Sequence, residues 1–379
     1  MKVLHFYKTY LPDSYGGAQQ VIFEICEGTR RYGVDSEVLA LSPHRTCSKN
    51  ISSHRAHFVR RAAKLASTDL SMSAIGRFRE LAAEADIVHY HFPWPLMDVA
   101  HFLARHGKPS VVTYHSDIVR QRLLYPLYKP LMHRFLSRVN VIVATSPAYV
   151  RTSPVLQLYR DKLRVVPIGI GGPDLDEPDP ALLAYWRARV GGGFFLFVGV
   201  ARHYKSLNVL LEAVRGTELP VVIAGAGSDK PYAKRPRIGS QFANVIYTDA
   251  VSEADKAALL HLCRAVVLPS ALRSEAFGIV LLEGAMHSKP LICCELGTGT
   301  TYVNVDGVTG LAVPPGDAVA LRDAMRRLNA DPEQARRYGR NARKRYLELF
   351  TAQRMASAYA GLYAEAVGAF ARSRRACAA

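Results

Sequence analysis

Short runs of apolar, often β-branched residues alternate along the chain with segments of helical periodicity. In the first half the apolar runs are KVLHFY, SEVLALS, DIVHYHF, PSVVTYH, NVIVATS and LRVVPIGI. Helical patterns such as GAQQVIFEICEGTRRYG and MDVAHFLARHG lie between several of them. Strands that alternate with helices predict a parallel sheet with crossover helices.

The same alternation starts again in the second half, through FFLFVGV, PVVIAGAG, NVIYTDA, AVVLPS, PLICCE and TGLAV. Between the halves lies GGPDLDEPDP, where prolines and acids cluster as in a linker. The sequence therefore predicts an α/β protein with an N-terminal domain at 1–172, a linker at 173–180 and a C-terminal domain at 181–350. A further helix over 351–379 is expected to pack back on the N-terminal domain.

Composition describes an ordinary globular protein, with 379 residues of which 49% are apolar. This length is sufficient for two hydrophobic cores. No run approaches the roughly 18 apolar residues of a membrane span, and the N-terminus lacks the regions of a signal peptide. We therefore expect a cytoplasmic location.

The net charge of +17 predicts affinity for polyanions, which include nucleic acid, anionic lipid headgroups and phosphorylated ligands. Zinc-finger spacing, an RNP aromatic motif and a basic tail are missing from the sequence, so no specific nucleic-acid partner is expected. The GxGxxG fingerprint is missing after the first strand of both halves, which argues against an NAD-dependent oxidoreductase.

Open parallel sheets bind ligands outside the carboxyl ends of their strands, so the residues that follow each strand are candidate contacts. Gly16 and Gly17 follow the first strand and precede a helix, where backbone can approach a ligand and free amides attract an anion. Arg202 and Lys205 follow FFLFVGV and precede another helix, a suitable place for a diphosphate. The alternative for the glycine pair is a simple turn, and the alternative for the two cations is a solvated loop.

The stretch RSEAFGIVLLEGAM carries two acids, Glu275 and Glu283. If a helix begins near Phe277 or Gly278, its free amides face a ligand, while Glu275 stays outside and Glu283 lies inside the helix. The roughly 12 Å between the acids is too long for a glycosidase pair that flanks one bond. We expect them to hold different parts of one long ligand, with Glu283 bound to ribose hydroxyls or, alternatively, to a neighbouring arginine.

No metal site is predicted, although two groups of side chains suggest one. His89 and His91 point to the same side of a strand, but no third ligand has an obvious companion spacing. Asp174 and Asp176 spell DxD, but inside the Pro-rich linker. His115 follows a strand, where an imidazole is placed to orient a hydroxyl or a developing charge, although such a histidine is more often structural.

Together these motifs resemble the retaining nucleotide-sugar glycosyltransferases of family 4, over nearly the full length. The segment from Glu275 to Glu283 matches the family's E-x7-E motif, and KPLICCELGTGTTYVNVDGVTGLAVPPGD is similar to its continuation. The resemblance implies the GT-B fold, with two Rossmann-like parallel-sheet domains facing across a cleft and C-terminal helices. Ser206, where the family commonly has glycine, and Gly284, where alanine is commoner, depart from the pattern.

The resemblance also implies roles for the candidate residues. It places Glu275 near the hydroxyls of the donor sugar, Glu283 on the ribose, and His115 at the reaction centre. Arg202 and Lys205 are expected to neutralise the diphosphate, so that no metal or cofactor is needed. The implied catalytic residues are His115, Glu275, Arg202 and Lys205, and the implied donor-binding residues are Gly16, Gly17, Arg202, Lys205, Glu275, Phe277, Gly278, Ile279, Val280 and Glu283.

Segments such as HYHFPWPLMDV and VVTYHSDIVRQ look most like a bacterial subgroup that adds mannose or rhamnose to lipid-linked O-antigen or exopolysaccharide precursors. The implied substrates are a nucleotide diphosphate sugar, with a GDP-sugar favoured, and a lipid-linked saccharide acceptor. A non-catalytic nucleotide-sugar binding protein of the same fold is the alternative, because fold does not fix function.

Residues 119–138 contain five arginines or lysines, no acid, and many leucines and aromatics. This composition is typical of a segment that contacts the anionic inner face of a membrane. A core-packing helical pair with a basic outer face is the alternative. In both cases Pro126 and Pro130 are expected to interrupt any single long helix.

Overall fold

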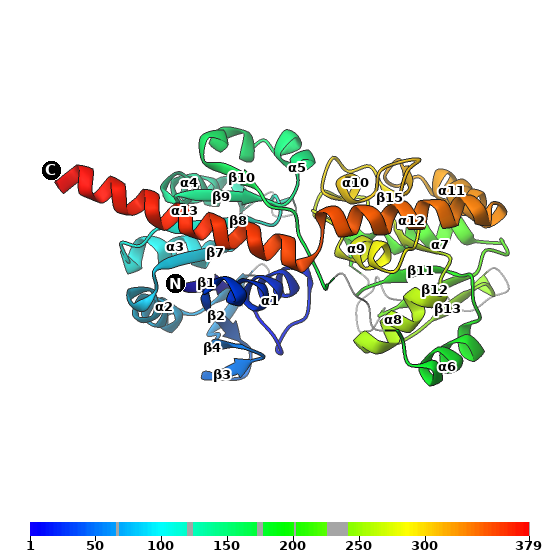
Figure 1. Cartoon of the computed structure of the whole chain (residues 1–379), viewed down its shortest axis with the longest axis horizontal. Coiled ribbons are helices and arrows are strands. Elements are labelled where there is room, and N and C mark those ends of the chain that lie inside the picture. Colours follow the sequence, from blue (N-terminus) through cyan, green and yellow to red (C-terminus); the bar gives the residue numbers. More distant parts are fainter. Residues whose placement is uncertain (66–67, 120–123, 173–176, 201, 226–241, 379) are drawn as a thin grey trace. The chain divides into compact units, whose positions relative to one another are not determined.

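The computed structural model describes residues 1–65, 68–119, 124–172, 177–200, 202–225 and 242–378. They form two compact units, drawn in Figure 1. Unit 1 comprises Met1–Gly171 and Thr351–Ala379, and unit 2 comprises Gly172–Phe350. Residues 173–176 of the predicted linker, with both acids of the DxD pattern, lie outside the described residues.

Unit 1 is built on an eight-stranded sheet in the order β10-β9-β8-β7-β1-β2-β4-β3. Its strands are β1 (Lys2–Tyr7), β2 (Asp35–Ser42), β3 (Cys47–Ile51), β4 (His54–Arg60), β7 (Ile87–Phe92), β8 (Ser110–Tyr114), β9 (Val141–Ala144) and β10 (Leu163–Val165), and β5 (Ala63–Leu65) and β6 (Thr68–Leu70) form a separate pair. β3 pairs antiparallel with β4, and the other neighbours in the large sheet pair in parallel. The predicted parallel sheet is confirmed, and β3 and β4 are an edge that the apolar runs did not predict.

The helices of unit 1 include the C-terminal one, α13. They are α1 (Gly17–Thr29), α2 (Met72–Glu84), α3 (Pro95–Ala104), α4 (Tyr125–Arg138), α5 (Pro147–Thr152) and α13 (Ala352–Ala378). Side chains of α13 at helical spacing are buried, from Met355 and Ala356 through Tyr359 to Tyr363. Gly28 of α1 faces Ala356 so closely that a Cβ on the glycine would lie 2.6 Å from the alanine Cβ. α13 therefore packs directly against α1 (Figure 1).

Helix α4 accounts for the described part of the basic segment, since residues 120–123 lie outside the described residues. The expectation that its prolines interrupt the helix is wrong. Pro126 occupies the first turn, where a backbone N–H has no intrahelical partner, and the helix continues through Pro130. Both prolines are exposed, so water can reach the carbonyl of Pro126, which Pro130 leaves unpaired. Among helices of the described residues, none has the length and apolar character required to cross a membrane.

Unit 2 contains a six-stranded parallel sheet in the order β13-β12-β11-β14-β15-β16. Its strands are β11 (Phe195–Val198), β12 (Val221–Ala224), β13 (Val245–Tyr247), β14 (Ala265–Leu268), β15 (Leu291–Cys294) and β16 (Gly310–Val313). Its helices are α6 (Pro180–Val190), α7 (Leu207–Val214), α8 (Glu253–Leu262), α9 (Ile279–Met286), α10 (Thr300–Val303), α11 (Ala318–Ala330) and α12 (Pro332–Leu349). The strands match the predicted apolar runs because central parallel strands are buried on both faces.

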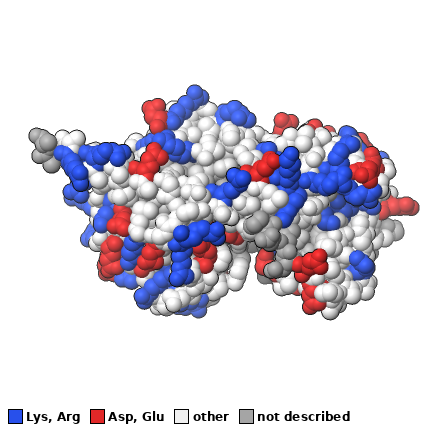
Figure 2. Space-filling view, in the orientation of Figure 1, with Lys and Arg blue, Asp and Glu red and all other residues white. Residues whose placement is uncertain are grey.

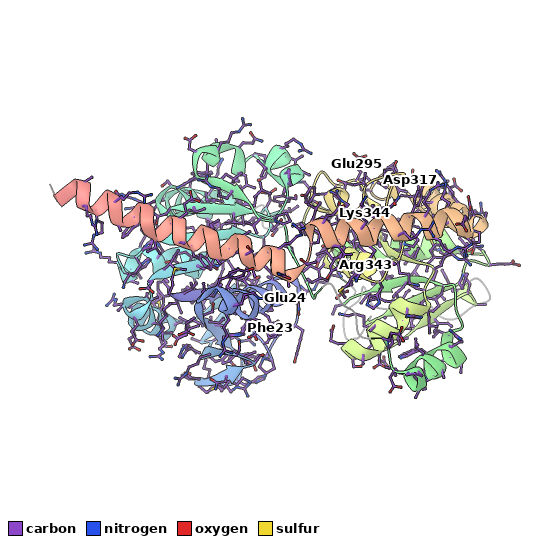
Figure 3. All side chains as sticks on the ribbon, in the orientation of Figure 1. Phe23, Glu24, Glu295, Asp317, Arg343 and Lys344 are labelled. Carbon is purple, nitrogen blue, oxygen red and sulfur yellow. The ribbon has the colours of Figure 1, made fainter. Side chains whose placement is uncertain are left out.

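Lys and Arg side chains gather on the surface over α12 (Figure 2). This helix buries a stripe that includes Tyr338 and Tyr346, so its other face turns Arg336, Arg340 and Lys344 to solvent. Arg343, labelled in Figure 3, is half-buried and donates a hydrogen bond to the carbonyl of Met286 at 2.7 Å. This bond ties α12 to the end of α9, the helix that carries the second acid of the E-x7-E motif.

Candidate functional site

The sheet of unit 2 has its switch point between β11 and β14, because the strands before and after them are added in opposite directions. Ligands of open α/β sheets bind outside the carboxyl ends of strands at such a point. The loop after β11 carries Arg202 and Lys205, and the loop after β14 carries Glu275. Topology therefore brings together three residues that were predicted from separate motifs.

Lys205 lies in this loop with its ammonium folded back over the end of β11. Its Nζ is 3.4 Å from the carbonyl oxygen of Val198 and 5.9 Å from the centre of the Phe197 ring. A Cβ on Gly199, whose φ is +133°, would lie 2.3 Å from that nitrogen. Gly199 was missed by the sequence analysis, and its missing side chain leaves the space that the ammonium occupies. Arg202 is exposed at the start of the same turn.

Ser206 follows in a left-handed conformation, with φ +49°. Glycine adopts this conformation without a steric penalty, whereas a residue with a Cβ adopts it at a cost. The serine hydroxyl accepts a hydrogen bond from the backbone N–H of Ala271 at 3.2 Å. The serine that stands in place of glycine thus adds a hydrogen bond between the loop after β11 and the loop after β14.

Glu275 is half-buried in the loop before α9. Burial raises the pKa of its carboxyl, while the Lys205 ammonium, the Ser270 hydroxyl and the Gly278 backbone N–H oppose the rise. Ser270 donates to the carboxylate at 3.3 Å. Tyr204 lies close by: burial raises the pKa of its phenol to about 12, with Glu275 adding to the rise. Lys205 and Glu275 are therefore electrostatic neighbours, as one shared ligand would require.

Helix α9 begins at Ile279, with Gly278 as a left-handed residue before it. The side chains of Phe277 and Val280 are buried in the unit 2 core, and Phe277 packs edge-on against Phe350. These two residues can reach a ligand only through their backbone. The first amides of a helix lack intrahelical partners, and one of them, that of Gly278, already faces Glu275.

Glu283 lies inside α9 and forms an ion pair with Lys256 of α8, at 2.7 Å from Nζ to Oε1. Lys256 also binds Glu253 at 2.7 Å. The side chains of Lys256 and Glu283 are only 17% and 16% exposed. Ribose and a neighbouring arginine were the two partners expected from the sequence, and the protein partner is instead a lysine 27 positions away. This ion pair engages Oε1 of the carboxylate.

Gly284, the second departure from the family pattern, packs against the sheet. A Cβ there would lie 2.7 Å from Cγ2 of Val266 and 2.9 Å from Cδ2 of Leu291.

We expect Gly284→Ala to lower the free energy of unfolding by about 1 kcal/mol, because overpacking outweighs the gain in helix propensity. Gly361→Ala is the matched control: in α13 its Cβ meets nothing within 4 Å, so it should stabilise by about 0.5–1 kcal/mol. Denaturant unfolding measures both, and changes of the same sign would contradict the packing argument.

In unit 1 the predicted glycine pair and His115 lie in segments that follow different strands. Gly16 and Gly17 are exposed at the start of α1, which follows β1. His115 follows β8 and is half-buried. Burial lowers the pKa of its imidazole to about 3, with a smaller contribution from Lys8. His115 is therefore neutral at pH 7 and can hydrogen-bond a ligand without a charge.

A cluster of buried histidines lies beneath His115. His5, His89 and His91 offer ring nitrogens within 4.8 Å of one another. The third ligand that the spacing of His89 and His91 did not reveal is thus His5, which the register of β1 and β7 sets opposite His89. Both ring nitrogens of His89 and of His91 form hydrogen bonds of 2.7–3.1 Å. A metal ion would have to break these bonds, so we do not assign the cluster to metal.

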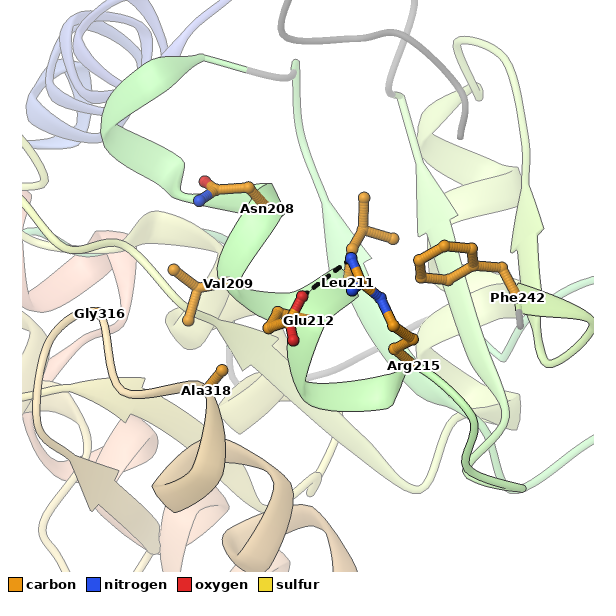
Figure 4. Close-up of a pocket in the computed structure, with 8 residues that line it drawn as sticks. All are labelled: Asn208, Val209, Leu211, Glu212, Arg215, Phe242, Gly316 and Ala318. Atoms are coloured by element: carbon orange, nitrogen blue, oxygen red, sulfur yellow. Dashed lines mark ion pairs between the residues drawn. The ribbon is translucent and has the colours of Figure 1, made fainter. Parts of the chain in front are cut away.

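A pocket away from these residues lies beside α7 and has a volume of about 420 Å³. Figure 4 shows its lining, in which Glu212 and Arg215 form an ion pair of 2.9 Å. The lining residues are Asn208, Val209, Leu211, Glu212, Arg215, Phe242, Gly316 and Ala318. None of the predicted site residues lines this pocket, so we do not assign it to the candidate functional site.

Comparison with known proteins gives consistent results for both units. Residues 15–171 match Glycosyltransferase Family 4, and residues 186–345 match Glycosyl transferases group 1. A D-rhamnosyltransferase of Pseudomonas aeruginosa is 53% identical over 93% of both chains. An O-antigen chain mannosyltransferase of Escherichia coli is 46% identical over 96% of this chain and 98% of its own.

Among solved structures, a sucrose-phosphate synthase of Thermosynechococcus elongatus superposes with a TM-score of 0.76. It is 20% identical, and the match covers 97% of this chain and 99% of that chain. This likeness concerns the fold alone. It confirms the predicted GT-B class, with two Rossmann-like parallel sheets and C-terminal helices.

Proposed function

The chain belongs to the family 4 glycosyltransferases, and on this premise we propose that it moves a hexose, mannose or rhamnose, from a GDP-sugar to a lipid-linked saccharide. The product would serve bacterial surface polysaccharide synthesis. The names of the two relatives support this choice, since one is a D-rhamnosyltransferase and the other an O-antigen mannosyltransferase. The observation that carries the proposal is the meeting of Lys205 and Glu275 at the switch point of unit 2.

In the proposed reaction unit 2 binds the donor. Lys205 and Arg202 neutralise the diphosphate, the amides at the start of α9 add partial positive charge, and Glu275 binds sugar hydroxyls. Glu283 binds the ribose. The helix-start residues from Phe277 to Val280 contribute mainly through backbone, because Phe277 and Val280 are buried. Two cations at the diphosphate supply the neutralisation that a divalent metal supplies elsewhere, so we propose transfer without a metal.

We assign the acceptor to unit 1, where His115 follows β8 and the pair Gly16 and Gly17 lies at the start of α1. The acceptor oxygen forms a bond to the anomeric carbon, and the bond from that carbon to the diphosphate oxygen breaks. The bonding electron pair leaves with the diphosphate, which accepts the proton of the acceptor hydroxyl. Attack on the face that the leaving group departs from gives retention, and Glu275 then has no need to act as a nucleophile.

A donor screen tests the proposal. A saturating true donor or its nucleotide should raise the melting temperature, because a ligand that binds only the folded state stabilises it. We expect GDP-mannose or GDP-rhamnose to do so more than UDP-hexoses, and to support transfer to a lipid-linked saccharide with EDTA present. Stabilisation by a UDP-hexose alone would overturn the GDP preference. Binding without transfer to any lipid-linked acceptor would favour the non-catalytic alternative.

We also propose that the basic face of α4 contacts an anionic membrane. This helix buries Met132 and Phe135 towards unit 1, while Leu127 is 80% exposed. Arg134 and Arg138 follow Leu127 by seven and eleven positions, so they lie on the same side of the helix, and both face solvent. An exposed leucine beside cations is typical of an interfacial helix. Each cation near an anionic membrane surface contributes roughly 1 kcal/mol to the free energy of membrane binding.

Co-sedimentation with phosphatidylserine-containing vesicles tests this surface. Arg134→Glu with Arg138→Glu should weaken binding by about 10-fold or more. The same charge change on α12, Arg336→Glu with Arg340→Glu, is the matched control and should have a smaller effect. Equal losses would indicate an unspecific charge effect, and failure of the intact protein to bind at low salt would end this part of the proposal.

A further inference from the structure

A row of three histidines runs from the core of unit 1 to the candidate reaction site. The rings come from the neighbouring strands β1 and β7 and from the end of β8. Nδ1 of His5 is 3.1 Å from Nε2 of His91, and Nδ1 of His91 is 3.0 Å from Nε2 of His115. His5 and His91 are fully buried, and His115 is half-buried.

These contacts allow only two arrangements of protons. Burial lowers the pKa of His5 and of His115 to about 3 and that of His91 well below its usual value. All three rings are therefore neutral, and each carries one N–H. A hydrogen bond between two ring nitrogens needs one proton, so the two contacts are both satisfied only if every ring is protonated on Nδ1 or every ring on Nε2.

The buried end of the row decides between the two arrangements. Nε2 of His5 is buried and has no hydrogen-bond partner among the described residues. Protonation on Nε2 throughout would leave an unpaired N–H there, and buried N–H groups without an acceptor are rarer than unpaired lone pairs. Protonation on Nδ1 throughout places all buried N–H groups in hydrogen bonds and directs the last one, on His115, outwards. Among the described residues Nδ1 of His115 has no other hydrogen bond.

We propose that His5 and His91 are positioning residues that keep the proton of His115 on Nδ1. His115 then offers a neutral N–H donor, and not a base, to an oxygen of the ligand. That a ligand oxygen lies there rests on the proposed function, whereas the position of the proton does not. A donor suits the proposed reaction, in which the leaving diphosphate takes the proton of the acceptor hydroxyl and no side chain has to act as its base.

A second buried network beside the row provides an internal control. Nδ1 of His89 bonds the Tyr363 hydroxyl of α13, and Nε2 bonds the Thr113 hydroxyl, both at 2.7 Å. Thr113 in turn bonds the hydroxyl of Tyr359 at 2.7 Å. The ring of His89 lies close to that of His91, with ring centres 4.3 Å apart and the planes tilted by 32°. Tyr363→Phe therefore removes a buried hydrogen bond from the same region without touching the row.

Nitrogen-15 NMR of the full chain, labelled at histidine, reads the protonated nitrogen of each ring directly. Replacement of single histidines assigns the signals. We expect the Nδ1–H form for His5, His91 and His115 in the unchanged protein. In His91→Phe, Nε2 of His115 loses its partner, so the proton should move to it in a part of the molecules. Tyr363→Phe should leave the His115 signals unchanged.

Kinetics provide the second measurement. His91→Phe should lower kcat by about 10- to 100-fold and add little to His115→Ala in the double variant, whereas Tyr363→Phe should stay near the unchanged protein. A proton on Nε2 of His115 in the unchanged protein would overturn the inference. This outcome does not depend on whether the variants fold. Because the spectra need no substrate, a lack of transferase activity would overturn the proposed function and leave the proton assignment standing.

Discussion

Lys205→Ala is expected to lower kcat by about 100- to 1,000-fold, the loss typical of removing one preorganised group that meets developing charge. The ammonium lies beside Val198 and Gly199 at the end of β11 and is an electrostatic neighbour of Glu275. Negative charge grows on the leaving diphosphate in the transition state. The variant should therefore lose more in kcat than in donor affinity.

Initial-rate kinetics with the donor found in the screen measure this change. Lys289→Ala is the matched control in the same unit, because Lys289 donates to the carbonyl of His261 at 2.7 Å and is no candidate for the site. Its kcat should stay within about threefold. If Lys205→Ala turned over at the rate of this control, the diphosphate would have to bind elsewhere.

Glu283→Ala is expected to raise the donor KM by about 10- to 100-fold, as loss of charge-assisted hydrogen bonds to two hydroxyls would. Its kcat should change much less, because the ribose carries no charge that develops in the reaction. The variant should remain folded, since Lys256 keeps its second partner, Glu253, at 2.7 Å.

The partner lysine separates the two roles that the sequence left open for Glu283. Lys256→Met removes the ion pair and leaves the carboxylate in place. If Glu283 binds ribose, the donor KM of this variant should rise far less than that of Glu283→Ala. Equal increases in both variants would show that the carboxylate acts through the ion pair, and that the ribose assignment is wrong.

The apolar runs predicted the strands of both large sheets well, with two exceptions. β3 is mostly half-buried and exposed in alternation, and β4 combines His54, Ala56 and Phe58 with exposed arginines. Neither strand has a continuous apolar run, so periodicity does not separate the two from loops. The prediction for Pro130 was wrong for a related reason. An exposed helix can leave one carbonyl group hydrogen-bonded to water, and the local sequence does not show whether a helix is exposed.

The candidate site was predictable where one short segment carries it. The E-x7-E stretch predicted a helix start near Phe277 or Gly278, and α9 begins at Ile279. By contrast, Gly199, Tyr204 and Ser270 were not singled out, because their roles depend on which loops meet at the switch point. The assignments of Arg202, Lys205, Glu275 and His115 remain predictions, and the kinetic experiments test those of Lys205 and His115.

The sequence by itself determined the elements, their order and the family, because strand runs, helix starts and motifs are encoded in residues close together in the chain. Only the tertiary structure decided which side chains form pairs with one another. Glu283 meets Lys256 across 27 positions and His89 meets Tyr363 across 274. Such pairs depend on sheet register and helix packing, which result from burial of the whole apolar surface and not from any local pattern.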